Sequence, residues 1–198
     1  MSAAFSLITP ALLVAITAMW VVCGLMHTKS PGRNLMLLVG LLAAAISLVP
    51  VRGVSLAGLM LSVNPVFSIG SLAGALMFAM SMAGWKIFLT LTEVAVFTYF
   101  GIAFPALLYA SYLGLIGPDI YAMGFGFSVW FVFVGAAGTG LLLSGSGLGF
   151  IPLAALAAFN LRLLNSDNLF DYLVDFPLML GCIAYVLRTK FIRRKPRY

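Results

Sequence analysis

Long apolar runs, separated by short polar or proline-containing breaks, follow one another along the whole chain. Apolar runs of about twenty residues are typical of transmembrane helices, because a helix of that length crosses the hydrocarbon core of a bilayer. The pattern predicts an all-α fold, a polytopic transmembrane helical bundle with six or seven spans, of which seven are favoured. The expected spans are about 6–26, 35–49, 66–85, 87–117, 120–143, 147–159 and 169–187.

One apolar run is too long for a single span. Residues 54–85 contain no charge, and Asn64-Pro65 lies inside them. Asn-Pro favours a turn, and a residue before proline avoids the helical region. We expect a broken helix or a re-entrant arm near 54–66. Non-helical backbone at membrane depth persists only where protein or a water-filled cavity covers it, so Asn64 is a candidate residue for transport.

Charge is scarce and unevenly distributed. Hydrophobic residues make up 63% of the 198 positions and charged residues 8%, against about 25% charged in soluble domains. The formal net charge is +6, and six of the eleven Lys and Arg lie in residues 188–198. Basic residues beside a span mark its cytoplasmic side. The sequence therefore predicts one bundle over 1–187, with its N-terminus outside, and a basic cytoplasmic tail over 188–198.

The basic tail is interpreted as a topology signal, and we expect no nucleic-acid partner. The lipid bilayer is the expected partner, together with other membrane subunits or further copies of the chain. Arg193, Arg194 and Lys195 are candidates for binding anionic lipid headgroups. The expected location is the cytoplasmic membrane of a bacterial or archaeal cell.

Glu93 is the clearest ionisable group inside a predicted span. A charged side chain at the bilayer centre costs roughly 2.5 to 3.5 kcal/mol on insertion scales, so such a residue is a functional candidate. Three interpretations stay open. Glu93 handles a proton or cation, it forms hydrogen bonds that hold two helices together, or it has a catalytic role.

Three aspartates, Asp167, Asp171 and Asp175, recur at intervals of four residues. On a continuous helix this spacing places them on one face. Such a face would bind a divalent cation through carboxylate oxygens, or it would form ion pairs with an arginine such as Arg162. Asp171 and Asp175 are also candidates for ion handling at the mouth of a cavity.

No resident cofactor is expected, apart from a divalent cation at these carboxylates. A single histidine, His27, excludes a His-ligated haem pair, a zinc cluster of histidines and a Ser-His-Asp triad. The glycine-rich stretch 144–149 lacks the lysine of a phosphate loop and is interpreted as a turn.

Three functions fit these patterns. The first is a transport or conduit component for a small solute, proton or cation, suggested by Glu93, by the break at Asn64 and by the aspartates. The second is a non-catalytic structural subunit of a larger multi-chain membrane complex. Small residues at helix-contact spacing, such as Gly70-xxx-Gly74 and Ala136-xxx-Gly140, suit it. The third is an Mg-dependent intramembrane enzyme acting on a lipid, although a non-enzymatic role is the expectation.

Overall fold

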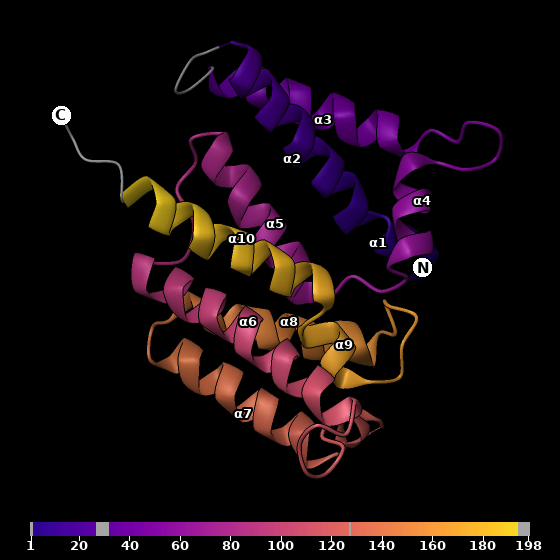
Figure 1. Cartoon of the computed structure of the whole chain (residues 1–198), viewed down its shortest axis with the longest axis vertical. Helices are drawn as coiled ribbons and strands as arrows, with labels where there is room; N and C mark the ends of the chain where they lie inside the picture. The colour runs from indigo at the N-terminus through magenta and orange to yellow at the C-terminus, as the bar shows by residue number, and fades with distance from the viewer. Residues whose placement is uncertain (1, 27–31, 127, 194–198) are drawn as a thin grey trace.

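The computed structural model describes residues 2–26, 32–126 and 128–193, with the side chains of residues 4–190 inside these ranges. Within them the chain forms helices and two isolated bridges, but no strand. Figure 1 shows the arrangement of the helices. Their bounds are α1 Ser2–Ser6, α2 Ile8–Leu25, α3 Arg33–Leu48, α4 Leu56–Val63, α5 Ile69–Met82, α6 Leu91–Tyr112, η1 Tyr121–Gly124, α7 Val129–Leu143, η2 Gly147–Gly149, α8 Phe150–Asn160, α9 Leu169–Leu173 and α10 Phe176–Arg193.

Helices α2 and α3 form an antiparallel hairpin that is attached to the rest of the molecule mainly through α5 (Figure 1). A small apolar cluster holds the hairpin together, centred on Met19 of α2 and Met36 of α3. Gly40 lets the two helices approach closely, since a Cβ there would lie 3.1 Å from the Met19 sulfur. The outer face of α3 carries leucines that no other described element covers.

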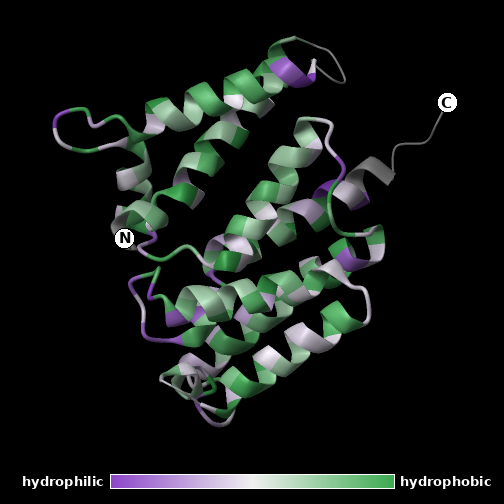
Figure 2. Cartoon of the chain, turned by 180° about the vertical axis from the view of Figure 1, so that it is seen from behind, coloured by the Kyte–Doolittle hydropathy of each residue, from purple (hydrophilic) through white to green (hydrophobic). Residues whose placement is uncertain are grey.

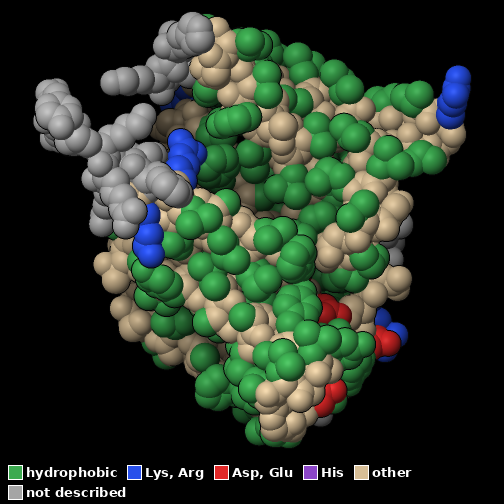
Figure 3. Space-filling view, in the orientation of Figure 1, with side chains coloured by type: hydrophobic (Ala, Val, Ile, Leu, Met, Phe, Trp, Pro, Cys, Tyr) green, Lys and Arg blue, Asp and Glu red, His purple; other side chains and the backbone are tan. Residues whose placement is uncertain are grey.

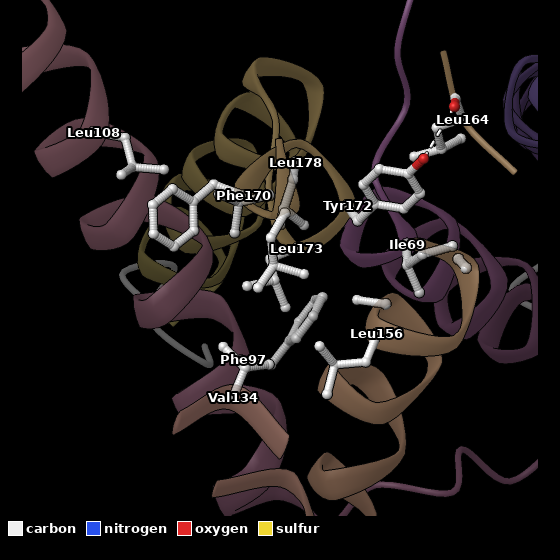
Figure 4. Close-up of a cluster of buried hydrophobic side chains, with 14 of the residues drawn as sticks. Ile69, Phe97, Leu108, Val134, Leu156, Leu164, Phe170, Tyr172, Leu173 and Leu178 are labelled. Atoms are coloured by element: carbon white, nitrogen blue, oxygen red, sulfur yellow. Dashed lines mark hydrogen bonds between the residues drawn. The ribbon is translucent and has the colours of Figure 1, made fainter. Parts of the chain in front are cut away.

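The main core lies among α5 to α10. It gathers Phe97 of α6, Leu156 of α8 and Leu178 of α10 around the short helix α9 (Figure 4). Helix α9 is the most deeply buried element, because Leu169 and Tyr172 are both 0% exposed. The Tyr172 hydroxyl donates a hydrogen bond of 2.9 Å to the Leu164 carbonyl, which satisfies its polar end in this apolar setting. A five-residue helix therefore fills the centre of the fold.

Glycines allow close packing around this core. A Cβ on Gly101 of α6 would lie 2.8 Å from the Cys182 sulfur of α10. A Cβ on Gly70 of α5 would lie 2.9 Å from a Leu178 methyl carbon and would collide with the Leu173 carbonyl. The Gly70-xxx-Gly74 pair thus packs inside the molecule. Gly140, in contrast, has open space beside it.

Two helices are long and apolar enough to cross a membrane, Ala4–Leu25 (α1 with α2) and Leu91–Tyr112 (α6), each of 22 residues. The other apolar helices that the structure describes are shorter, for example α5 with 14 residues and α7 with 15. At 1.5 Å per residue these two helices measure about 21 to 23 Å, less than the roughly 30 Å of a hydrocarbon core. These helix lengths therefore do not confirm a bundle of six or seven full-length spans.

The surface is strongly apolar along the helices (Figure 2). Large side chains such as Trp20, Leu41 and Leu91 are 62%, 70% and 90% exposed. On the face in Figure 3, Asp and Glu side chains gather at the lower right, and most Lys and Arg side chains lie at the upper left. Contiguous apolar surface of this kind is typical of contact with lipid or with another protein.

The sequence-predicted segments are corrected in two places. The 120–143 span is wrong at its beginning, because Tyr121–Gly124 form the short 3₁₀ helix η1 and α7 starts only at Val129. Gly126 has a φ of +66° there, a conformation that an α-helix does not contain. The 169–187 span is wrong as one continuous helix, because α9 ends at Leu173 and α10 begins at Phe176.

The predicted break near 54–66 is present. Helix α4 ends at Val63, and α5 begins at Ile69 after an extended stretch. Ser68 caps α5 by accepting a hydrogen bond from the Ser71 backbone N–H at 2.9 Å.

Candidate functional site

The beginnings of α5, α9 and α10 converge at one end of the molecule, which we call the acidic end because Asp119, Asp167, Asp171 and Asp175 all lie in the loops or first turns there (Figure 1). The opposite end, where α5 and α10 finish and α6 begins, is called the basic end. Helix starts carry free N–H groups and partial positive charge, which oxygen-bearing side chains satisfy. Three helix starts at one place therefore explain why polar side chains accumulate in the core at this end.

Asp175 joins two of these helix starts. Its Oδ1 accepts hydrogen bonds from the Leu178 N–H of α10 at 2.8 Å and from the Ser71 hydroxyl of α5 at 2.6 Å. Its Oδ2 accepts from the Ser68 N–H at 2.6 Å. The side chain is only 9% exposed. Burial raises the pKa of this carboxyl above its ordinary value, and the three hydrogen bonds partly offset that effect.

Asp171 ties α9 to the loop that contains η1. Both of its oxygens lie 3.0 Å from the Tyr121 hydroxyl, and Oδ2 also accepts from the Ser166 hydroxyl. Burial, and after it the charge of Asp171, raises the pKa of the Tyr121 phenol above its ordinary value. Tyr121 therefore remains a protonated donor to this carboxylate.

Asn168 completes the connection. Its Oδ1 caps α9 by accepting from the Phe170 N–H at 2.9 Å, and its Nδ2 donates to the Tyr121 carbonyl at 2.9 Å. The side chain is fully buried. Gly124 lies directly against it, and a Cβ on this glycine would collide with the Asn168 Oδ1. Tyr121 therefore holds the η1 loop to α9 in two ways. Its backbone carbonyl accepts a hydrogen bond from Asn168, and its hydroxyl donates to Asp171.

A cavity of about 140 Å³, open on one side, lies between these elements. Both Asp171 and Asp175 line it, and neither forms an ion pair with a Lys or Arg in the part of the chain that the structure describes. Helix α6 contributes Pro105 and Tyr109. The full lining is Asn64, Pro65, Val66, Pro105, Leu108, Tyr109, Tyr121, Asp171, Val174, Asp175 and Phe176.

Asn64, the residue singled out at the break, lies in this lining. It follows the last residue of α4, and its Nδ2 donates to the Val66 carbonyl at 2.6 Å, which shapes the extended stretch before α5. Its amide oxygen accepts no hydrogen bond from a described residue. The break therefore brings the Asn64 amide to the same cavity as the two carboxylates, although Asp171 lies 107 residues further along the chain.

The predicted metal face of Asp167, Asp171 and Asp175 is not formed. The three residues do not share a helix, because Asp167 precedes α9 and Asp175 follows it. Asp167 is exposed and lines a different pocket, together with Arg162. Among the described residues, no three His, Cys, Asp or Glu side chains are close enough together to hold a metal ion. The intramembrane enzyme that depended on this triplet loses its proposed metal site.

Glu93 lies at the basic end, in the first turn of α6, and not in the middle of a span. It forms a capping box with Thr90, whose N–H donates to its Oε2 at 2.7 Å. Its Oε1 accepts from the hydroxyl of Ser146, in the turn before η2. The carboxylate thus connects the start of α6 to the turn between α7 and α8, and the cavity lies at the other end of α6.

Replacing Glu93 with alanine is expected to lower the stability of the folded protein, because the Thr90 N–H and the Ser146 hydroxyl lose their acceptor. Glu93→Gln keeps one acceptor oxygen and should cause a smaller loss. Thr92→Ala, next to it on the exposed surface, is the matched control. The measurement is unfolding in mixed micelles followed by circular dichroism, and equal stability of all three variants would contradict the assigned hydrogen bonds.

The predicted lipid-binding residues lie at the end of the described part of the chain or outside it. Arg193 is the last residue of α10, without a described side chain, and Arg194 and Lys195 lie outside the described residues. His27 also lies outside them.

Several residues of the site were not predicted from the sequence, namely Ser68, Ser71, Tyr109, Tyr121 and Ser166. The sequence does carry local signals for two helix starts, namely Asn168 before an apolar run and Asp175 two residues before Pro177. They predict that a helix begins after each residue. No local pattern indicates that Asp175 contacts Ser71, 104 residues away.

Comparisons of this chain with protein-family models, with curated proteins and with solved structures find no match.

Proposed function

We propose that this chain is an integral membrane protein that acts as a transport or conduit component for a small cation or proton. Its support comes from the exposed apolar helix faces and from the two helices of spanning length. In this proposal α2, α3, α5, α6, α7, α8 and α10 all cross the bilayer, with the acidic end outside, in the cytoplasmic membrane of a bacterial or archaeal cell. Figure 1 supports the crossing order, since successive members of this set run in opposite directions.

The distribution of charge supports the orientation. Lys86 lies at the basic end, where the basic tail begins with Arg188 and Lys190. The positive-inside rule assigns this end to the cytoplasm. The shorter helices would be accommodated by local thinning of the bilayer, at a cost of fractions of a kcal/mol per Å of mismatch.

The observation that carries the proposed activity is the cavity, whose two carboxylates form no ion pair with any Lys or Arg among the described residues. A negative charge in a partly buried site attracts cations, and the low local dielectric strengthens that attraction. Asp171 has the better exposed carboxylate of the two, and it lies where the η1 loop, α6 and α9 meet. The cavity is therefore proposed as the outer binding site of the conduit.

The test uses sealed liposomes that contain the purified chain. Under an imposed membrane potential, the inward movement of protons, Na⁺ and tetramethylammonium is measured with internal dyes and by ion analysis. We expect at least one of them to move faster than in protein-free liposomes, and Asp171→Asn to slow it at least tenfold, because the carboxylate charge is lost.

Asp167→Asn is the matched control, since Asp167 is an exposed carboxylate four residues away that does not line the cavity. It should leave the flux unchanged. If the chain moves none of the three cations, the conduit function is wrong. If Asp171→Asn moves them as fast as the unmodified chain does, the cavity is not the binding site of the conduit.

A structural role in a larger membrane complex is the second candidate. It is favoured by the exposed face of α7, on which Ala136, Gly140 and Ser144 recur at intervals of four residues, with open space at Gly140. Such faces allow close helix contacts in lipid. Purification from native membranes in a mild detergent would reveal stoichiometric partner chains, and a chain that is isolated alone would count against this role.

A further inference from the structure

The lining of the cavity at the acidic end is chemically mixed. Two carboxylates and the Asn64 amide lie on it, and the rest consists of apolar and aromatic side chains. The rings of Tyr109 and Phe176 are packed edge to face, with centroids 6.3 Å apart. Mostly apolar walls with a few polar groups are typical of sites for organic ligands. The apolar and aromatic side chains of the lining, and not only its two carboxylates, therefore decide which ligand fits.

A divalent metal ion does not fit this lining. Mg²⁺ requires six oxygen ligands in a nearly octahedral arrangement, and Ca²⁺ requires six to eight. The carboxylate oxygens of Asp175 already accept three hydrogen bonds, and both oxygens of Asp171 accept at least one. An anion fits no better, because two carboxylates line the cavity and none of the described lysines or arginines does.

The volume limits the size of an organic ligand. The cavity measures about 140 Å³. An engineered apolar cavity of about 150 Å³ accommodates benzene, which has six non-hydrogen atoms. A ligand of about six non-hydrogen atoms would therefore fill the space.

We infer that the ligand of this cavity is a small organic ammonium ion with an apolar body of about five carbon atoms. This inference rests on the proposed function, because it concerns the same site. The ammonium group donates to Asp171, whose Oδ1 accepts, among the described residues, only the Tyr121 hydroxyl and so keeps a lone pair available. The apolar body lies against Leu108 and Val174, and the rings of Tyr109 and Phe176 favour the positive charge.

The inference is tested by calorimetry on the intact chain in lipid nanodiscs, with empty nanodiscs subtracted. The probes are cyclopentylamine, which is cationic at pH 7, its neutral analogue cyclopentanol, and MgCl₂. We expect cyclopentylamine to bind at one site at least tenfold more tightly than cyclopentanol, because a charge-assisted hydrogen bond stabilises only the amine. Asp171→Asn should remove this preference, and Asp167→Asn should retain it.

Equal binding of amine and alcohol, absence of amine binding, or Asp171-dependent binding of Mg²⁺ in preference to the amine would each overturn the inference. These results are distinguishable from failure of the proposed function. Asp171-dependent flux without amine binding means that the ligand class is wrong and the conduit stands. Asp171-dependent amine binding without flux means that the binding site is correct and the conduit function is wrong.

Discussion

Replacing Asp175 with alanine is expected to destabilise the folded protein by about 3 kcal/mol. The change removes the cap of α10 and leaves the Ser68 N–H and the Ser71 hydroxyl of α5 without their acceptor in a buried position. A lost cap costs about 1 kcal/mol, and each buried donor without a partner costs about 1 to 3 kcal/mol. The loss of a buried charge offsets part of that sum. Unfolding in mixed micelles, followed by circular dichroism, measures the effect.

Asp175→Asn keeps one acceptor oxygen, so we expect about half of that loss. Asp167→Ala is the control, because its exposed side chain makes no hydrogen bond with a described residue, and its effect should stay within about 0.5 kcal/mol. If Asp175→Ala and Asp167→Ala have the same free energy of unfolding, the connection between α5 and α10 contributes nothing to stability. The fold then depends on apolar packing alone at this end.

Replacing Gly124 with alanine is expected to destabilise the protein by about 3 kcal/mol, the upper range for inserting atoms into a packed site. The added methyl group would collide with the Asn168 Oδ1 and would lie 2.6 Å from a Phe170 ring carbon. Asn168 would have to move, and this movement would break both the cap of α9 and the hydrogen bond to the Tyr121 carbonyl. Because Tyr121 lines the cavity, the same variant should also weaken ligand binding there.

Gly140→Ala is the matched control, since a Cβ at this exposed helical position meets nothing within 4 Å. Alanine is the better helix former by about 1 kcal/mol, so this variant should be as stable as the unmodified chain or slightly more stable. If Gly124→Ala and Gly140→Ala have the same free energy of unfolding, the contact between the η1 loop and α9 does not contribute to stability.

The connection at Asp175 and the contact at Gly124 also indicate how far the site could be predicted. The sequence singled out Asn64, Asp171 and Asp175 because polar groups are rare in this chain, and the structure brings all three to one cavity. It also singled out Asp167 and Glu93. The structure places Asp167 in a different pocket and Glu93 at the opposite end of α6, where a capping box accounts for its hydrogen bonds.

The error about the aspartates has a physical cause. Spacing by four residues places side chains on one face only if the helix is continuous. Here Asn168 and Asp175 each cap a separate helix start, so the chain bends twice within eight residues. Hydrophobic periodicity cannot reveal this bend, because the apolar residues around Asp171 are buried on every side of the short helix α9.

The sequence by itself determined the helical class, the apolar surface, the break at Asn64-Pro65 and the separation of basic from acidic ends. Each of these follows from composition, from the backbone preferences of single residues or from charge position along the chain. The tertiary structure alone decided which helices reach spanning length, that α9 fills the core, and that Asp175 joins α5 to α10. Those features depend on contacts between residues about 100 positions apart, such as Ser71 with Asp175, and the close packing that selects such contacts leaves no local pattern in the chain.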